Sequence, residues 1–194
     1  MVNAERHAVA AAQETAVANE RVLRPSLAAL WRALDAVPDP EIPVVSVHEL
    51  GMVRGLEWDE ADPATLVVHL TPTYSGCPAT DVIRESITDA LLAQGALKVR
   101  VAMQLSPAWT TDWMTADARR KLRDFGIAPP SGVARAAVVD VSAIRGRRRA
   151  AERIACPRCG SRNTECIAQF GSTACKAHFR CVDCAEPFDY FKPF

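Results

Sequence analysis

Two closely spaced cysteine pairs near the C-terminus constrain the fold of this chain more than any other feature. They are Cys156 with Cys159 and Cys181 with Cys184, two C-x-x-C steps with 21 residues between them. Each step can turn both of its sulfurs toward one ion, so the two steps supply four thiolates in a tetrahedral arrangement. Gly160 directly follows the first step and suits the turn that such a pair needs. The spacing therefore predicts a small four-cysteine zinc ribbon.

A disulfide framework is the alternative role for these cysteines. The chain has seven Cys, which is an odd number, and the Ala-rich stretch from Val9 to Ala12 is too short and too weakly apolar for a secretory signal or a membrane span. We therefore expect a cytoplasmic protein whose reduced thiols hold a structural metal. Zinc is favoured because it needs no redox partner, although four thiolates would also bind iron. The metal would stabilise a segment of about 40 residues that buries too little core to fold alone.

The rest of the chain divides into an N-terminal segment, one domain and a linker. A chain of 194 residues has room for a domain of about 120 residues beside the ribbon. We expect a flexible segment over 1–24, a domain over 25–144, a basic linker over 145–151 and the ribbon over 152–194.

Charge is distributed unevenly over a chain whose formal net charge is zero. The first 144 residues carry 13 Lys and Arg against 18 Asp and Glu, and the last 50 carry 10 against 5. The sharpest cluster is Arg145 with the run Arg147 to Arg149. Such a run could be a solvated linker, a contact for an acidic protein or a contact for nucleic acid. Nucleic acid is the least favoured, because the ribbon lacks the alternation of basic and aromatic residues typical of single-strand binders.

Hydrophobic periodicity predicts a small two-layer α+β or α/β domain with three to four strands and three helices. The first helix starts at Pro25 and Ser26 and ends before Pro38. Its apolar stripe has helical spacing and comprises Leu27, Leu30, Trp31 and Leu34. Further helices are expected at 78–93, with an apolar face of Val82, Ile83, Ile87, Ala90 and Leu91, and at 115–125. Strands are expected at 44–47, 52–58, 65–70 and 97–105, with an edge strand at 137–141.

A loop between the strand at 65–70 and the helix at 78–93 carries a cysteine in a position suited to chemistry. Gly76 permits a positive φ just before Cys77, and Pro78 can serve as the first helical residue. The positive end of the helix dipole would then favour a thiolate at Cys77. Such a thiolate could ligate a transferable metal or attack an electrophile. The alternative is that Cys77 only fills space in the core.

Other polar residues offer partners for this cysteine. Covalent catalysis would need a base, and His48 and His69 are the candidates, although a histidine in a strand is more often a cross-strand partner. Asp39 and Glu41 lie two residues apart in a turn rich in proline. They could ligate a metal or accept hydrogen bonds from a nest of backbone N–H groups, and the alternative is that the turn simply requires polar residues. The residues alone therefore indicate a thiolate-bearing α/β domain with a metal ribbon.

Several motifs resemble known families. The segments Asp39 to Pro43, Val45 to Val53 and Thr71 to Pro78 resemble the iron–sulfur assembly domain family, whose bacterial members include SufT-type proteins. The stretch from Phe170 to Ala177 and the ending from Glu186 to Lys192 are similar to the PaaD (PaaJ) family of the phenylacetate-degradation oxygenase. The resemblance spans residues 26–194.

This resemblance implies an accessory or maturation role for the multicomponent phenylacetyl-CoA epoxidase of aerobic phenylacetate catabolism, with iron or Fe–S cluster assembly as its task. It implies Cys77 as the candidate iron or Fe–S ligand. Supporting residues would be Asp39, Glu41, Thr73 and Gly76. Cys175 would be an additional metal-handling thiol or a replacement for one sulfur of the quartet, and the alternative is that it is a buried packing cysteine, as we expect for Cys166. The implied cofactors are zinc and a transient Fe–S cluster or iron.

The same resemblance implies partners rather than a reaction carried out by this chain. The sequence has no pair of Glu-x-x-His repeats for a di-iron site and no Gly-rich dinucleotide fingerprint. Catalysis would therefore lie on other subunits, and the expected partners are the oxygenase or reductase components, or a second copy of this chain. No membrane contact is expected. The alternative is a stoichiometric subunit that docks the components.

Overall fold

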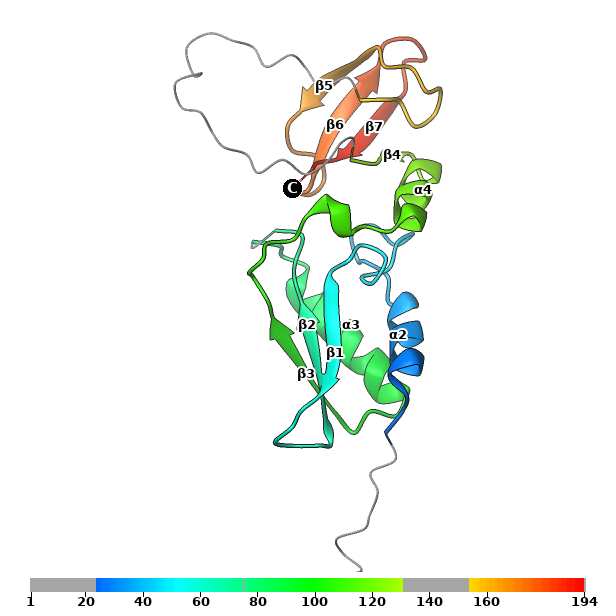
Figure 1. Cartoon of the computed structure of the whole chain (residues 1–194). Helices are drawn as coiled ribbons and strands as arrows, with labels where there is room; N and C mark the ends of the chain where they lie inside the picture. The colour runs from blue at the N-terminus through cyan, green and yellow to red at the C-terminus, as the bar shows by residue number, and fades with distance from the viewer. Residues whose placement is uncertain (1–23, 75, 131–153, 194) are drawn as a thin grey trace, which may run out of the picture.

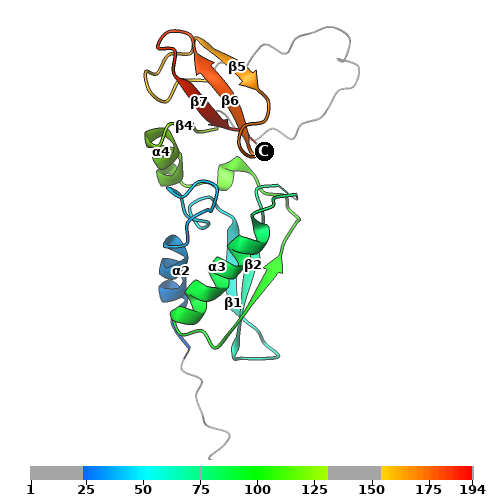
Figure 2. The ribbon, with the colours of Figure 1, turned by 180° about the vertical axis from the view of Figure 1, so that it is seen from behind.

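The computed structural model describes residues 24–74, 76–130 and 154–193. Figure 1 shows an α/β domain at one end and a β-ribbon domain at the other, and Figure 2 shows the same arrangement from behind. The predicted edge strand at 137–141, the Arg-rich linker and nearly all of the N-terminal segment 1–24 lie outside the described residues. Among the described helices, none combines the length and the apolar character that crossing a bilayer would require.

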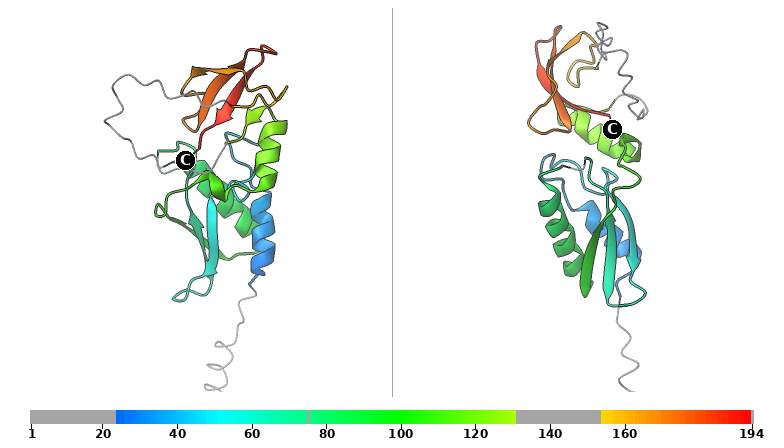
Figure 3. Two further views of the ribbon diagram at one scale, coloured as in Figure 1. Left: turned by 45° about the horizontal axis from the view of Figure 1, so that its top comes forward. Right: turned by 90° about the vertical axis from the view of Figure 1, so that its left-hand side faces the viewer.

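The α/β domain has two layers, as the sequence predicted. Its elements, in chain order, are α2 (Leu27–Asp35), β1 (Val53–Trp58), β2 (Thr65–Leu70), α3 (Thr80–Ala93) and β3 (Lys98–Met103). The strands form one sheet in the order β1-β2-β3, antiparallel between β1 and β2 and parallel between β2 and β3. Helices α2 and α3 cover one face of this sheet (Figure 3, right). A 3₁₀ turn (Thr111–Trp113) and α4 (Ala116–Asp124) follow.

The start of helix α2 and the face that it buries both follow from its local sequence. The Ser26 hydroxyl accepts the Ala29 N–H at 3.2 Å and caps α2. In α2 the buried residues are Leu30 and Leu34, whereas Leu27 is 41% exposed, so the predicted stripe was wrong at its first position. Leu27 is the first residue of α2.

Helix α3 buries a narrower face than the sequence predicted. Ile83, Ile87 and Leu91 recur at every fourth position and are buried, while Val82 is 51% exposed. The predicted inclusion of Val82 in the apolar face was therefore wrong. Neighbouring helix positions lie about 100° apart, so Val82 turns away from the sheet while Ile83 faces it.

The predicted strand at 44–47 was also wrong. This segment belongs to a run of turns, with only an isolated bridge between Ser46 and Pro38. The backbone N–H of Val45 bonds to the Ile42 carbonyl at 3.1 Å and so closes a turn. The β-branched side chains of Val45 and Val47 are nevertheless buried, because the turns direct them into the core.

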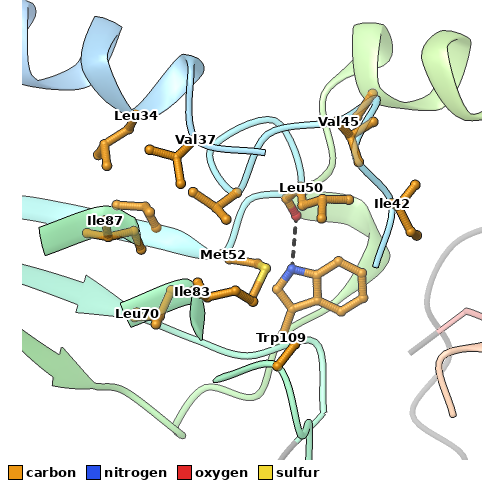
Figure 4. Packing of buried hydrophobic residues seen from close by; sticks show 14 of the residues in the cluster. Leu34, Val37, Ile42, Val45, Leu50, Met52, Leu70, Ile83, Ile87 and Trp109 are labelled. Carbon is orange, nitrogen blue, oxygen red and sulfur yellow. Dashed lines mark hydrogen bonds between the residues drawn. The ribbon is translucent and has the colours of Figure 1, made fainter. Parts of the chain in front are cut away.

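A main core of buried hydrophobic residues fills the space between the sheet and the helices and continues into the ribbon. It includes Leu34, Met52, Leu70, Ile83 and Trp109 (Figure 4) and, from the ribbon, Cys175 and Phe191. The Trp109 indole N–H donates to the Leu50 carbonyl at 3.0 Å, so the polar end of a buried ring is paired. This bond ties the segment after β3 to the turns before β1.

The second sheet joins the two domains. Its strands are β4 (Ile127–Ala128), β5 (Thr164–Ala168), β6 (Lys176–Cys181) and β7 (Pro187–Phe191), in the order β4-β7-β6-β5. Strand β4 directly follows α4 and pairs in parallel with β7. The ribbon sheet therefore contains a strand from the chain of the first domain.

Aromatic side chains complete this junction. Phe179, Phe188 and Tyr190 form the ribbon's own core. Phe191 instead enters the main core, where its ring centroid lies 6.0 Å from that of Trp109. The aromatics near the second cysteine pair thus both cover the ribbon and dock it.

Candidate metal centre and interdomain site

The structure brings the four cysteines of the two C-x-x-C steps together. All four sulfurs lie within 4.8 Å of one another. The Sγ atoms of Cys156 and Cys184 are 3.8 Å apart, and those of Cys159 and Cys181 are 3.6 Å apart. These separations fit four thiolates around a single tetrahedral ion such as zinc.

Backbone geometry shapes both cysteine steps. Gly160 has φ +77°, and its N–H bonds to the Cys156 carbonyl at 2.9 Å, which confirms the predicted turn. Ala185 occupies the same place after the second step and has φ +62° although it carries a Cβ. The backbone N–H of Cys184 leads the effects that lower the pKa of Cys181 to about 7. The Glu186 N–H lowers the pKa of the Cys184 thiol, but burial and neighbouring sulfurs outweigh it and raise that pKa, so the thiolate that a metal needs is favoured at Cys181 and not at Cys184.

Cys77 lies in the loop between β2 and α3 and is partly exposed. Helix α3 starts at Thr80 with Ala79 as its N-cap, so the prediction that Pro78 is the first helical residue was wrong. The Thr80 backbone N–H and hydroxyl both donate to the Cys77 carbonyl, at 3.3 and 2.8 Å. These bonds close a separate turn between the cysteine and the helix.

The acidic pair near this loop is divided between two environments. Asp39 is 7% exposed, and its Oδ1 accepts the N–H groups of Glu41 and Ile42, each at 2.9 Å. Asp39 therefore accepts backbone hydrogen bonds, which was one of the two predicted roles. Burial raises the pKa of the Asp39 carboxyl, and these two N–H groups oppose that rise. Glu41 is exposed.

Tyr74 lies where several predicted site residues meet. Partial burial raises the pKa of its phenol, and the negative charges of Cys77, Cys175 and Glu41 raise it further. A Cβ on Gly76 would lie 3.1 Å from the Tyr74 ring, so glycine lets the ring lie against the loop. Thr73, one residue before, is 8% exposed.

Cys175 comes from the ribbon but belongs to the main core, against which Cys77 packs. It is 8% exposed, and the Thr173 hydroxyl lies 3.0 Å from its sulfur. Burial raises the pKa of the Cys175 thiol, while the Thr173 hydroxyl and the charge of Lys176 lower it. Cys175 precedes β6, at the end of the ribbon that faces the α/β domain (Figure 1). It does not belong to the sulfur quartet.

Sequence reasoning missed a buried lysine beside this thiol. The Lys176 side chain is 6% exposed, and its Nζ lies 3.5 Å from Asp189 Oδ2 on β7. Its charge also acts on Asp39 and Cys175. Only its place next to Cys175 could have drawn attention to it, because the burial arises from docking. We call Asp39, Tyr74, Cys77, Cys175 and Lys176 the interdomain cluster.

The remaining candidates lie in other surroundings. His48 Nδ1 is 2.6 Å from Asp35 Oδ1 on α2, and His69 Nε2 is 2.9 Å from Glu57 Oε1 on β1. Cys166 is exposed on β5, so the expectation of a packing role for it was wrong: it lies on the edge strand, away from both cores.

Two family models match separate parts of the chain. Residues 27–103 match the model of iron–sulfur cluster assembly proteins, and residues 141–192 match that of the PaaD zinc beta ribbon domain.

Solved structures similar to the chain cover about half of it. One is a domain of unknown function (DUF59) from Bacillus anthracis, 28% identical with a TM-score of 0.43, and it covers 48% of this chain and 87% of its own. Another is a Mycobacterium tuberculosis protein described as associated with Fe–S complex assembly and repair, 32% identical with a TM-score of 0.33 over 55% of this chain and 93% of its own.

A curated protein is similar over almost the whole length. It is a putative 1,2-phenylacetyl-CoA epoxidase subunit from Escherichia coli (strain K12), 46% identical over 173 residues. The match covers 87% of this chain and 93% of that protein. The chain therefore belongs to the PaaD family of phenylacetyl-CoA epoxidase subunits.

Proposed function

We propose that this protein is an accessory protein of the phenylacetyl-CoA epoxidase system in aerobic phenylacetate catabolism, and that it assists the assembly of iron or an Fe–S cluster in another component. Iron is the cargo, and Cys77 is its ligand on this chain. The observation that carries the proposal is the partly exposed thiol of Cys77 in a loop of the iron–sulfur assembly domain. A cargo ligand must be reachable by the partner that receives the ion.

The surroundings of Cys77 support a holding role. The Cys77 carbonyl accepts hydrogen bonds from the Thr80 N–H and hydroxyl, and Gly76 leaves room for the Tyr74 ring, so the turn between Cys77 and α3 is held in place. His48 is hydrogen-bonded to Asp35 and His69 to Glu57, and among the described residues no hydrogen bond joins either histidine to Cys77, as a base that activates this thiol would require. This arrangement favours metal ligation over covalent catalysis.

The ribbon has a separate, structural task in this proposal. Cys156, Cys159, Cys181 and Cys184 hold a zinc ion that remains in place. The ion stabilises a small domain whose own core comprises few residues.

A test measures the iron content of the client proteins. The epoxidase components are co-expressed with wild-type protein, with Cys77→Ser or with Cys166→Ser, and iron and acid-labile sulfide are measured in each purified component. We expect a deficit with Cys77→Ser only, because Cys166 is also exposed but lies on β5. Full iron and sulfide with Cys77→Ser would reject the proposal.

A second candidate function is that of a docking component within the oxygenase complex. It is favoured by the name of the E. coli relative, which describes a subunit, and by two exposed apolar side chains near the ribbon edge, Ile167 at 54% and Phe170 at 69%. A docking component would co-elute stoichiometrically with the oxygenase at micromolar concentration, and separation of the two would count against it.

A further inference from the structure

We propose that Cys175 of the ribbon is the second thiolate ligand for the iron that Cys77 holds, so that the two domains of one chain form the cargo site together. This inference rests on the proposed function and deepens it.

The position of Cys175 is set by the docking of the ribbon. Its carbonyl accepts the Lys192 N–H at 3.0 Å, which ties the start of β6 to the end of β7. Phe191, the last residue of β7 and the neighbour of Lys192, lies in the main core against Trp109. The β4–β7 pairing holds the same end of the ribbon onto the chain of the α/β domain. These contacts together hold Cys175 and the start of β6 toward the first domain.

The β2–α3 loop lies next to this end of the ribbon. Cys77 packs against the core that contains Cys175, and Tyr74 interacts electrostatically with both cysteines. In Figures 1 and 2 the end of the ribbon from which β6 starts faces the α/β domain on the side of the loop that leads from β2 to α3. The two thiols that are not part of the quartet and not on β5 are thus both placed at the junction of the two domains, one in the main core and one packed against it.

Two polar groups lie beside the sulfur of Cys175. Cys175 is part of the apolar main core, and burial raises the pKa of its thiol, but the Thr173 hydroxyl, 3.0 Å from the sulfur, and the charge of Lys176 both lower that pKa. A hydroxyl donor and an ammonium group both stabilise the negative charge of a metal-bound thiolate. Thiolates are the ligands that Fe–S clusters and soft metal ions select.

Two thiolates leave the site open, as transfer requires. Among the described residues, the quartet is the only group of three or more donors within 4.8 Å of one another. The interdomain cluster therefore presents fewer ligands than the four that a cluster normally takes. The missing ligands would come from the receiving protein or from a second copy of this chain.

The test counts thiolate bonds with Co²⁺ as the probe. The full-length, zinc-loaded chain is reduced and titrated anaerobically with Co²⁺, and the thiolate-to-cobalt charge-transfer absorption is recorded while released zinc is measured. We expect wild type and Cys166→Ser to bind one Co²⁺ beyond the retained zinc, with the intensity of two thiolate bonds. Cys175→Ser should show half that intensity and at least about tenfold weaker binding.

Three results overturn the inference. They are wild-type intensity and affinity in Cys175→Ser, a one-thiolate signal in the wild type, and no Co²⁺ bound beyond the zinc. If Cys77→Ser loses the signal while Cys175→Ser keeps it, only the second ligand is rejected, and the iron content of the clients still decides the proposed function.

A measurement on the wild type guards against a variant that does not fold. Phenylarsine oxide bridges two thiols that lie close together, and mass spectrometry identifies the bridged peptides. We expect a bridge between Cys77 and Cys175 in the zinc-loaded chain. Modification that never joins these two peptides would contradict the shared site.

Discussion

At the scale of single residues, the two cysteine steps form the same turn with different residues in the position of positive φ. Gly160 and Ala185 both have positive φ, +77° and +62°, one residue after the second cysteine of their step. A Cβ in this conformation costs about 1 kcal/mol, so the second step carries strain that the first does not. The difference gives a matched pair of substitutions.

We predict that Ala185→Gly stabilises the zinc-loaded protein by up to about 1 kcal/mol, because glycine adopts this φ without strain. Gly160→Ala should destabilise it by about 1 kcal/mol, since nothing lies within 4 Å of the added Cβ and only the backbone strain remains. Denaturant unfolding with zinc in excess measures both. A loss of stability in Ala185→Gly would contradict the prediction.

Two variants of Asp39 separate what its hydrogen bonds contribute to stability from what its charge contributes. In Asp39→Asn the amide oxygen can still accept both N–H groups, so we expect it to be at least as stable as wild type at neutral pH. Asp39→Ala leaves both N–H groups without the side-chain acceptor and should cost about 1–3 kcal/mol. Thermal or denaturant unfolding of the two variants distinguishes these outcomes.

The pH dependence of Asp39 has a definite sign. Its pKa is raised above 3.8 in the folded chain, chiefly by burial, so the folded state holds that proton more tightly. Its contribution to stability is present below the ordinary pKa and is lost as the pH rises through the folded pKa. Unfolding measured across this acidic range should show the loss in wild type and not in Asp39→Asn. Identical profiles for the two proteins would contradict it.

At the scale of elements, helix ends are decided by local hydrogen bonds. The Thr115 hydroxyl accepts the Ala118 N–H at 3.0 Å and caps α4, the helix that leads into β4. The Thr88 hydroxyl in α3 instead donates to the carbonyl of Arg84 within the same helix, at 2.8 Å. The first bond pairs an N–H that the helix leaves free, and the second does not.

We therefore predict that Thr115→Ala destabilises the protein by about 1 kcal/mol through loss of the cap. Thr88→Ala should be neutral or slightly stabilising, because alanine has the higher helix propensity. Unfolding in urea compares the two variants. Equal effects of both would show that the cap does not decide the stability of α4.

At the scale of the whole molecule, the ribbon and the α/β domain share structure. Strand β4 belongs to the ribbon sheet, and Phe191 and Cys175 lie in the main core. A metal that orders the ribbon should therefore also stabilise the first domain, and the two should unfold together.

Removal of the quartet's metal with a strong chelator should lower the melting temperature of the α/β domain as well as that of the ribbon. Phe191→Ala should uncouple the two and cost about 3–5 kcal/mol, since Phe191 is 1% exposed. Calorimetry combined with near-UV circular dichroism of tryptophan follows the first domain, because all four tryptophans of the chain lie in it. An unchanged transition of that domain after metal removal would contradict the coupling.

Local patterns alone determined much of this protein. The cysteine spacing, the main helices and strands, and the loop motif around Cys77 could be predicted because each depends on residues close together in the sequence. The tertiary structure decided the rest. It placed two residues after α4 in the ribbon sheet, buried Lys176, and put Cys175 into the main core against which Cys77 packs. These features arise from contacts between segments far apart in the chain, and no local pattern encodes which segments will meet.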